Sequence, residues 1–296
     1  MVTPPQLPDW LARLYPFAPR SFVTPRGARM SFLDEGPRSD EAVLMLHGNP
    51  TWSFYYRELV HAVRETRRCV VPDHIGMGLS QKPQDYDYAL ATRIADIEAL
   101  VASLALNRIH LVVHDWGGAI GFGFAAKHPE MMGRLVILNT AAFPSPHLPA
   151  RIALCKAPVV GPLLVRGLNG FAWPATRMAM HARALSREER RAYLFPYDSW
   201  ANRVAVSEFV RDIPMSPSHR SWSALTAAGD GLAQFRNNPT AILWGLKDFC
   251  FHQAFLDRWM KIFPAAEKAA FHEAGHYLLE DAPDAVSFVE CFLSNP

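Results

Sequence analysis

The sequence predicts an α/β protein in which a mostly parallel sheet carries helices on both faces and a helical insertion covers one edge. Three observations predict this fold class. Short apolar runs alternate with longer segments of helical period, a pattern typical of parallel sheets. The alternation stops between about residues 144 and 234. A Gly-Gly pair follows one apolar run at residues 117–118, which indicates a very tight strand-to-helix turn.

Each apolar run is a predicted strand, because runs rich in Val, Ile and Leu are typical of strands buried on both faces. The predicted strands are residues 42–46, 68–71, 109–114, 135–138, 241–244 and about 268–271. The segments of helical period predict helices at residues 54–65, 92–104, 119–127, 253–262 and 282–293.

The stretch from residue 144 to residue 234 is rich in Pro, helical in character and without a convincing β-run. It lies between two predicted strands, where a helical cap would cover an active site. We therefore expect a first core part at residues 1–143, a cap at residues 144–234 and a second core part at residues 235–296. The Arg-rich piece at residues 183–191 is interpreted as a solvated face of a cap helix.

The composition narrows the possible partners and locations. A chain of 296 residues can bury a large core, and a net charge of only +2 without blocks of like charge indicates neither nucleic acid nor an anionic membrane as partner. The four cysteines are widely spaced and form no metal-binding pattern, so we expect reduced thiols, no metal and no cofactor.

No apolar run approaches the length of a transmembrane helix, and residues 1–10 lack the features of a secretory signal. We expect a cytoplasmic protein.

The most informative segment is the run Leu-Val-Val-His-Asp-Trp-Gly-Gly at residues 111–118. A buried strand that turns sharply into a helix is typical of the nucleophile elbow of α/β-hydrolases, so we expect that fold, with its eight-stranded sheet. The reactive position holds Asp115 rather than Ser or Cys. A carboxylate is ionised at neutral pH and can attack without first losing a proton. The matching electrophile is a saturated carbon that bears a leaving group, and the product of attack is an alkyl ester.

Water must then open this ester, which requires a base. In this fold the chain order is nucleophile, acid and then His. His276 follows the last predicted strand and is the predicted base, whereas His272 lies in that strand and is interpreted as a packed or partly exposed side chain. Asp248, after the strand at residues 241–244, is the predicted acid that orients His276, because Asn139 after the preceding strand carries no charge. A role for Asp248 in a turn or at a helix N-terminus remains open.

The loop at residues 46–52 is expected to approach Asp115 closely, because Gly48 allows close backbone contact. It can aim a backbone N–H at the carboxylate. The side chains of Asn49 and Trp116 add two neutral donors, which suit a leaving group that departs as a compact anion. His47 is interpreted as structural.

The segments His-Gly-Asn-Pro-Thr at residues 47–51, His-Asp-Trp-Gly-Gly at residues 114–118 and Gly-His at residues 275–276 resemble those of haloalkane dehalogenases. The resemblance implies displacement of a halide ion from a small apolar substrate by Asp115 and hydrolysis of the ester by water that His276 activates. It implies that Asn49 and Trp116 hold the halide, that Asp248 completes the triad, and that the chain can self-associate. Many dehalogenases carry a Glu where this sequence has Asn139, so the chain matches the Asp–His–Asp subgroup. Haloalkane dehalogenation is the predicted function.

Further segments resemble the β-lactone decarboxylases of bacterial olefin biosynthesis: residues 139–144, 191–193 with 196–198, and 212–214. This second resemblance implies that cis-3,4-dialkyl oxetan-2-ones are converted to an olefin and carbon dioxide at the same site, and it is the first alternative. The candidate residues of the substrate pocket are Phe143, Tyr193, Tyr197 and Tyr277.

An epoxide hydrolase is the second alternative, because Tyr193 and Tyr197 in the cap could act as its acids. Asn49 opposes this interpretation, since epoxide hydrolases usually carry an aromatic residue there. A non-catalytic receptor on the same fold is disfavoured because Asp115, Asp248 and His276 are all present. A cofactor-free oxygenase remains a minor alternative.

Overall fold

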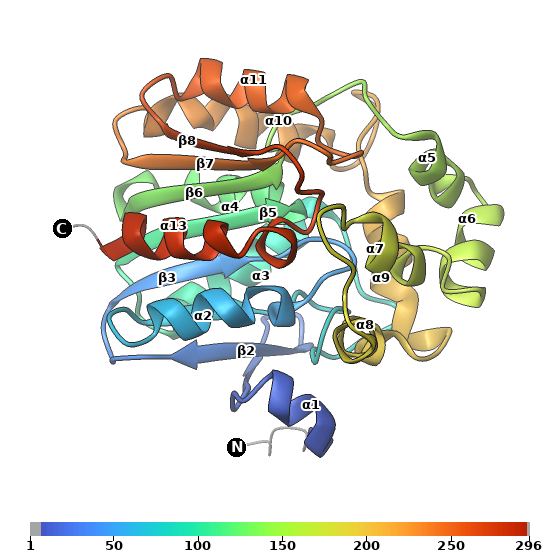
Figure 1. The fold of residues 1–296 in the computed structure, drawn as a ribbon. Coiled ribbons are helices and arrows are strands. Elements are labelled where there is room, and N and C mark those ends of the chain that lie inside the picture. Colours follow the sequence, from blue (N-terminus) through green and yellow to red (C-terminus); the bar gives the residue numbers. More distant parts are fainter. Residues whose placement is uncertain (1–6, 295–296) are drawn as a thin grey trace.

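An eight-stranded sheet forms the centre of the computed structural model, which describes residues 7–294 (Figure 1). The strand order is β1-β2-β4-β3-β5-β6-β7-β8. The β1–β2 and β2–β4 pairs are antiparallel and all other pairs are parallel. The strands are β1 Arg20–Val23, β2 Arg29–Glu35, β3 Glu41–Leu46, β4 Cys69–Pro72, β5 Arg108–Asp115, β6 Met132–Thr140, β7 Thr240–Gly245 and β8 Glu267–Phe271. The predicted mostly parallel, eight-stranded sheet is confirmed.

The apolar pattern located the six strands from β3 to β8, but it missed the positions of β1 and β2. Strand β1 is a short edge strand whose residues are exposed or half-buried, so it lacks an apolar run. Strand β2 is largely buried, yet it contains the charged residue Asp34. The Asp34 carboxylate accepts a hydrogen bond of 2.7 Å from Nε of Arg68, which compensates the buried charge.

Helices cover both faces of the sheet, because alternate side chains of each parallel strand point to opposite sides. Val43 and Met45 of β3 pack with α2 and α13, whereas Leu44 and Leu46 pack with α3, α4 and α11. The helices of the core are α1 Asp9–Leu14, η1 Ser53–Tyr56, α2 Arg57–Val63, α3 Leu90–Ser103, α4 Trp116–Ala125, η2 Pro129–Met131, α11 Gln253–Ile262, α12 Leu278–Asp281 and α13 Pro283–Ser294. The five predicted core helices are present, with ends shifted by a few residues.

The insertion between β6 and β7 is entirely helical. Its elements are α5 Ala150–Lys156, α6 Val160–Pro162, η3 Leu163–Gly167, α7 Ala172–Met178, α8 Arg187–Leu194, η4 Phe195–Tyr197, η5 Ala201–Arg203, α9 Val204–Arg211, α10 Trp222–Gly231 and η6 Leu232–Phe235. Helices α5 to α9 lie beyond the carboxyl ends of the parallel strands (Figure 1). Helix α10 instead packs on α3 and α4. We therefore propose that the cap ends near residue 220, before the expected boundary at residue 234.

A buried ion-pair network joins the cap to the core. Glu280 of α12 is contacted by Arg57 of α2 at 3.0 Å and by Arg183 of the cap at 2.9 Å. The hydroxyl of Tyr193 in α8 donates a third hydrogen bond to Glu280, at 2.6 Å.

Between residues 7 and 294, none of the helices combines the length and the apolar character needed to cross a bilayer.

Candidate functional site

Asp115 ends β5 and directly precedes α4, at the sharp turn that the sequence predicted. Its backbone has φ 52° and ψ −125°, a conformation that residues with a side chain rarely adopt and that costs roughly 1–3 kcal/mol. The turn needs Gly117, because a Cβ atom there would collide with the carbonyl oxygen of Leu46. The surrounding structure therefore fixes the Asp115 side chain at the edge of the sheet.

The Asp115 carboxylate is held from two sides. The backbone N–H of Asn49 donates to Oδ1 at 2.7 Å, and the backbone N–H of Trp116 also donates to the carboxylate. A Cβ atom on Gly48 would collide with the carboxylate, so the glycine permits this close approach. Burial raises the pKa of Asp115 above its ordinary value, and His276 and the two N–H donors offset part of this rise. These donors favour the anionic form that can act as a nucleophile.

His276 lies between two carboxylates. Its Nδ1 is 2.7 Å from Oδ2 of Asp248, and its Nε2 is 3.6 Å from Oδ2 of Asp115. Nδ1 therefore donates to Asp248, which leaves Nε2 facing Asp115. Burial lowers the pKa of His276, but Asp248 and Asp115 raise it more, so the pKa lies above the ordinary value of 6.5. The structure thus brings the three predicted catalytic residues together, while His272 is exposed just beyond β8.

Asn139 orients the acid, a role that the sequence analysis missed. Its Nδ2 donates to Oδ2 of Asp248 at 3.0 Å, and its Oδ1 accepts a hydrogen bond from the backbone N–H of Gly245 at 2.8 Å. The backbone N–H of Cys250 donates to the other Asp248 oxygen at 2.6 Å. Asp248 is buried, and both of its carboxylate oxygens accept hydrogen bonds. The available signal was the position of Asn139 at the carboxyl end of an apolar strand, because such strand ends meet at one edge of the sheet.

Asn49 and Trp116 both line the cavity beside Asp115. The Asn49 amide donates one N–H to the carbonyl of Val206 at 3.1 Å, which leaves its second N–H available. The indole N–H of Trp116 has no hydrogen-bond partner within residues 7–294. The site therefore offers two uncommitted neutral donors next to the carboxylate.

Arg93 lies behind Trp116 and was not recognised from the sequence. Its guanidinium carbon is 4.8 Å from the centroid of the Trp116 ring and 3.5 Å from that of Phe209. Nη1 is 3.5 Å from the Asp212 carboxylate, yet Nε and Nη1 have no hydrogen-bond partner. Burial lowers the pKa of Arg93 to about 10, so the group stays charged at neutral pH. A cation against the indole ring makes its N–H a stronger donor.

A cavity of about 470 Å³ lies between the cap and the core and contains Asp115 and His276. Its lining is mostly apolar and comes from both parts of the chain, with Leu148, Ile152, Phe171, Met178 and Ile213 from the cap and Phe143, Phe249, Phe251 and Phe255 from the core. Such a cavity suits an apolar substrate with only a few polar atoms.

Two of the four expected pocket residues lie at this cavity and two do not. Phe143 and Tyr277 line it. The expectation for Tyr193 and Tyr197 is wrong, because the hydroxyl of Tyr193 binds Glu280 and that of Tyr197 donates to the carbonyl of Thr51 at 3.3 Å. The Tyr193 ring packs on Phe54 and Tyr277 of the core, with ring centroids 5.1 and 5.2 Å away. These cap tyrosines therefore cannot supply the acids of an epoxide hydrolase.

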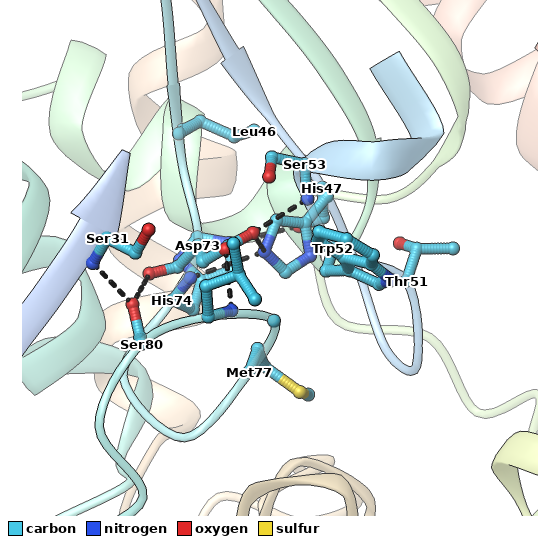
Figure 2. Close-up of polar contacts among 12 residues, drawn as sticks. Ser31, Leu46, His47, Thr51, Trp52, Ser53, Asp73, His74, Met77 and Ser80 are labelled. Atoms are coloured by element: carbon cyan, nitrogen blue, oxygen red, sulfur yellow. Dashed lines mark hydrogen bonds and ion pairs between the residues drawn. The ribbon is translucent and has the colours of Figure 1, made fainter. Parts of the chain in front are cut away.

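A buried polar cluster supports the loop that carries Gly48 and Asn49. Figure 2 shows Asp73 accepting the backbone N–H of Ser53, and the bond length is 2.7 Å. His74 contacts the carbonyl of His47 through Nε2 at 3.0 Å. Burial raises the pKa of Asp73 to about 6 and lowers that of His47 to about 4, so His47 is neutral at pH 7. His47 is buried and hydrogen-bonded within this cluster, and its structural role stays a prediction. In residues 7–294 no cluster of three His, Cys, Asp or Glu side chains could hold a metal ion.

Comparison with known proteins adds to this geometry. The family model described as alpha/beta hydrolase fold matches residues 41–283. A cis-3-alkyl-4-alkyloxetan-2-one decarboxylase from Shewanella oneidensis is 46% identical, with 93% of this chain and 88% of the relative covered. A protein of the same name from Xanthomonas campestris is 43% identical, with 95% of this chain and 98% of the relative covered.

Haloalkane dehalogenases are more distant in sequence but alike in structure. Haloalkane dehalogenase 2 of Mycobacterium tuberculosis is 30% identical, with 93% of this chain and 94% of the relative covered. The crystal structure of a haloalkane dehalogenase from Bradyrhizobium elkani superposes with a TM-score of 0.83 at 27% identity, covering 94% of this chain and 98% of that one. The decarboxylases are thus more similar to this chain in sequence than the dehalogenase is.

Proposed function

The chain belongs to the α/β-hydrolase fold family, on the branch that includes haloalkane dehalogenases, and we propose that it decarboxylates cis-3,4-dialkyl oxetan-2-ones to olefins. The observation that carries this proposal is the 46% and 43% identity to two decarboxylases, against 30% to the dehalogenase. Haloalkane dehalogenation, the first expectation, becomes the second candidate.

In the first proposed step the Asp115 carboxylate attacks ring carbon 4 of the β-lactone. A bond forms between an Asp115 oxygen and carbon 4, and the bond between carbon 4 and the ring oxygen breaks. Its electron pair stays on that oxygen, so the opened ring carries a carboxylate. The uncommitted N–H groups of Asn49 and Trp116 can donate to the charge that develops there.

In the second step the carboxylate leaves as carbon dioxide. The electron pair of the broken carbon–carbon bond forms the double bond between carbons 3 and 4, and the bond from carbon 4 to Asp115 breaks with its electrons returning to Asp115. The apolar cavity favours this step, because a carboxylate without its water shell loses carbon dioxide more readily. The raised pKa of His276 favours an imidazolium, which stabilises the carboxylate that reforms on Asp115.

The cavity also suits the two alkyl chains of the proposed substrate. Ile152 and Phe171 bring apolar surface from the cap side, and Phe143 and Phe255 bring it from the core side. Asp115 and His276 lie in the same cavity, so the ring would face the carboxylate while the chains contact the two walls.

A direct assay compares the two candidate reactions on purified protein. We expect olefin and carbon dioxide from a cis-3,4-dialkyl oxetan-2-one at a higher kcat/KM than halide from 1-bromo- or 1-iodoalkanes. Asp115→Asn should abolish both reactions. Rapid halide release without olefin formation would contradict decarboxylation as the first candidate function.

Dehalogenation remains the second candidate because the Asn49–Trp116 donor pair also suits a halide ion. In that reaction Asp115 displaces the halide, and His276 in its neutral form activates water that opens the ester.

A cytoplasmic location and a homo-oligomeric state stay predictions.

A further inference from the structure

Exposed apolar side chains are concentrated on the cap. Among residues 7–294, ten large apolar side chains are exposed, and only one of these, Val23, lies outside the cap. Seven of them form what we term the cap apolar patch: Leu154, Val159, Val160, Leu163, Leu168, Trp173 and Met178. Figure 1 places α5 and α6 at the edge of the cap far from the sheet. Exposed apolar groups gathered in this way mark an interaction surface.

Positive charge exceeds negative charge around this patch. Residues 131–187 contain no Asp or Glu but seven Lys or Arg. Arg177 lies over the Trp173 ring at 3.8 Å, and Arg151 contacts the sulfur of Met178 at 3.5 Å. Lys156 and Arg166 also lie in this part of the cap. In the described part of the chain, no carboxylate forms an ion pair with any of the four cations Arg151, Lys156, Arg166 and Arg177. The nearby Glu208 is paired with Arg211 at 2.7 Å.

We propose that the cap apolar patch docks on the surface of an anionic phospholipid bilayer. Apolar side chains next to unpaired Lys and Arg, with Trp among them, fit the boundary between headgroups and acyl chains. A second copy of the chain fits less well, because a symmetric contact would bring two sets of unpaired cations together. The net charge of +2 gave no sign of this surface, since acidic residues elsewhere offset the charge of the cap.

The patch is continuous with the cavity. Helix α5 carries Leu154 on the outside and lines the cavity with Ile152 and Cys155. Met178 of α7 belongs both to the patch and to the cavity lining. A long-chain β-lactone dissolved in a bilayer would thus meet the cap directly at the cavity. This last point rests on the proposed function, whereas the docking itself does not.

The test measures vesicle binding, which does not depend on turnover. The protein is sedimented with vesicles of phosphatidylcholine alone and with vesicles that also contain phosphatidylglycerol. We expect binding to the anionic vesicles, weak binding to the neutral ones, and loss of binding at high salt. Leu168→Asp combined with Trp173→Asp should weaken binding by at least about tenfold.

Val23→Asp is the matched control, because Val23 is 58% exposed but lies on β1. It should bind anionic vesicles as the wild type does, and both variants should keep the wild-type melting temperature. The proposal is overturned if the wild type ignores anionic vesicles or if the double variant binds them equally well. It is also overturned if the double variant instead dissociates a dimer seen by light scattering, which would assign the patch to a second copy. Failure of the β-lactone assay would leave the vesicle result standing.

Discussion

At the scale of single residues, the proposed chemistry depends on Asp115 forming a covalent bond to substrate carbon. His276 lies 3.6 Å away and, in the dehalogenation candidate, acts only after this bond has formed, in hydrolysis of the ester. With a 1-bromoalkane, we expect His276→Phe to react once and then stall as an alkyl-enzyme, which intact-mass spectrometry detects. Because Cys250 also lines the cavity, the control is Asp115→Ala combined with His276→Phe. An adduct on that control, or none on His276→Phe with binding shown independently, would contradict the assigned nucleophile.

The pH dependence separates the two candidate reactions. Hydrolysis of the alkyl ester needs neutral His276. In that intermediate Asp115 is an uncharged ester, so Asp248 alone raises the pKa of His276 against the lowering by burial. Bromoalkane turnover should therefore fall in acid as His276 takes up a proton. Decarboxylation consumes no water and continues with the imidazolium, so it should fall only at the lower pH where Asp115 becomes protonated. If turnover of the bromoalkane and of the β-lactone fell over the same acidic pH range, His276 would not have different roles in the two reactions.

Arg93 is a positioning residue that acts through Trp116. Arg93→Met removes a cation–π contact worth roughly 0.5–2 kcal/mol. Loss of up to this amount of transition-state stabilisation through the indole N–H lowers kcat, by no more than about 30-fold, with little change in KM. Arg220→Met is the matched control, because Arg220 also pairs with Asp212, at 2.9 Å, but is half exposed. If both variants lose kcat equally, Asp212 rather than Trp116 explains the effect.

At the scale of elements, helix α8 joins the cap to the core rather than forming a wall of the cavity. The Tyr193 hydroxyl donates to the Glu280 carboxylate at 2.6 Å. We expect Tyr193→Phe to lower stability by about 1.5–3 kcal/mol, the usual contribution of a hydrogen bond to a charged group. Its kcat on a β-lactone should stay at the wild-type level. Loss of activity at an unchanged melting temperature would place Tyr193 at the substrate after all.

The elements also show what the sequence could predict and why. Asp115, Asp248 and His276 were predicted because each stands at or shortly after the end of a parallel strand, and such strand ends meet at one edge of a sheet. Tyr193 was misassigned because a helical pattern does not tell which side of a cap helix faces the cavity. Asn139 and Arg93 were missed because their partners, Asp248 and Trp116, lie far away in sequence.

At the scale of the whole molecule, the division into core and cap was expected from the interrupted strand–helix alternation. We propose an earlier end of the cap than the expected boundary at residue 234, because α10 has the same helical pattern as its neighbours but packs on α3 and α4. The reaction was harder to predict, since the haloalkane and β-lactone routes use the same Asp, His and donor pair. The two proposed routes differ in whether water takes part in the reaction, because only dehalogenation ends with hydrolysis of the ester on Asp115.

The most direct measurement of that difference is turnover in ¹⁸O-labelled water, followed by mass spectrometry of the peptide that contains Asp115. With a cis-3,4-dialkyl oxetan-2-one we expect olefin to accumulate while Asp115 stays unlabelled, because the elimination returns the original oxygen to the side chain. A 1-bromoalkane serves as the positive control, since hydrolysis of its ester introduces ¹⁸O into Asp115. Labelled Asp115 and a β-hydroxy acid from the lactone would contradict the proposed decarboxylation.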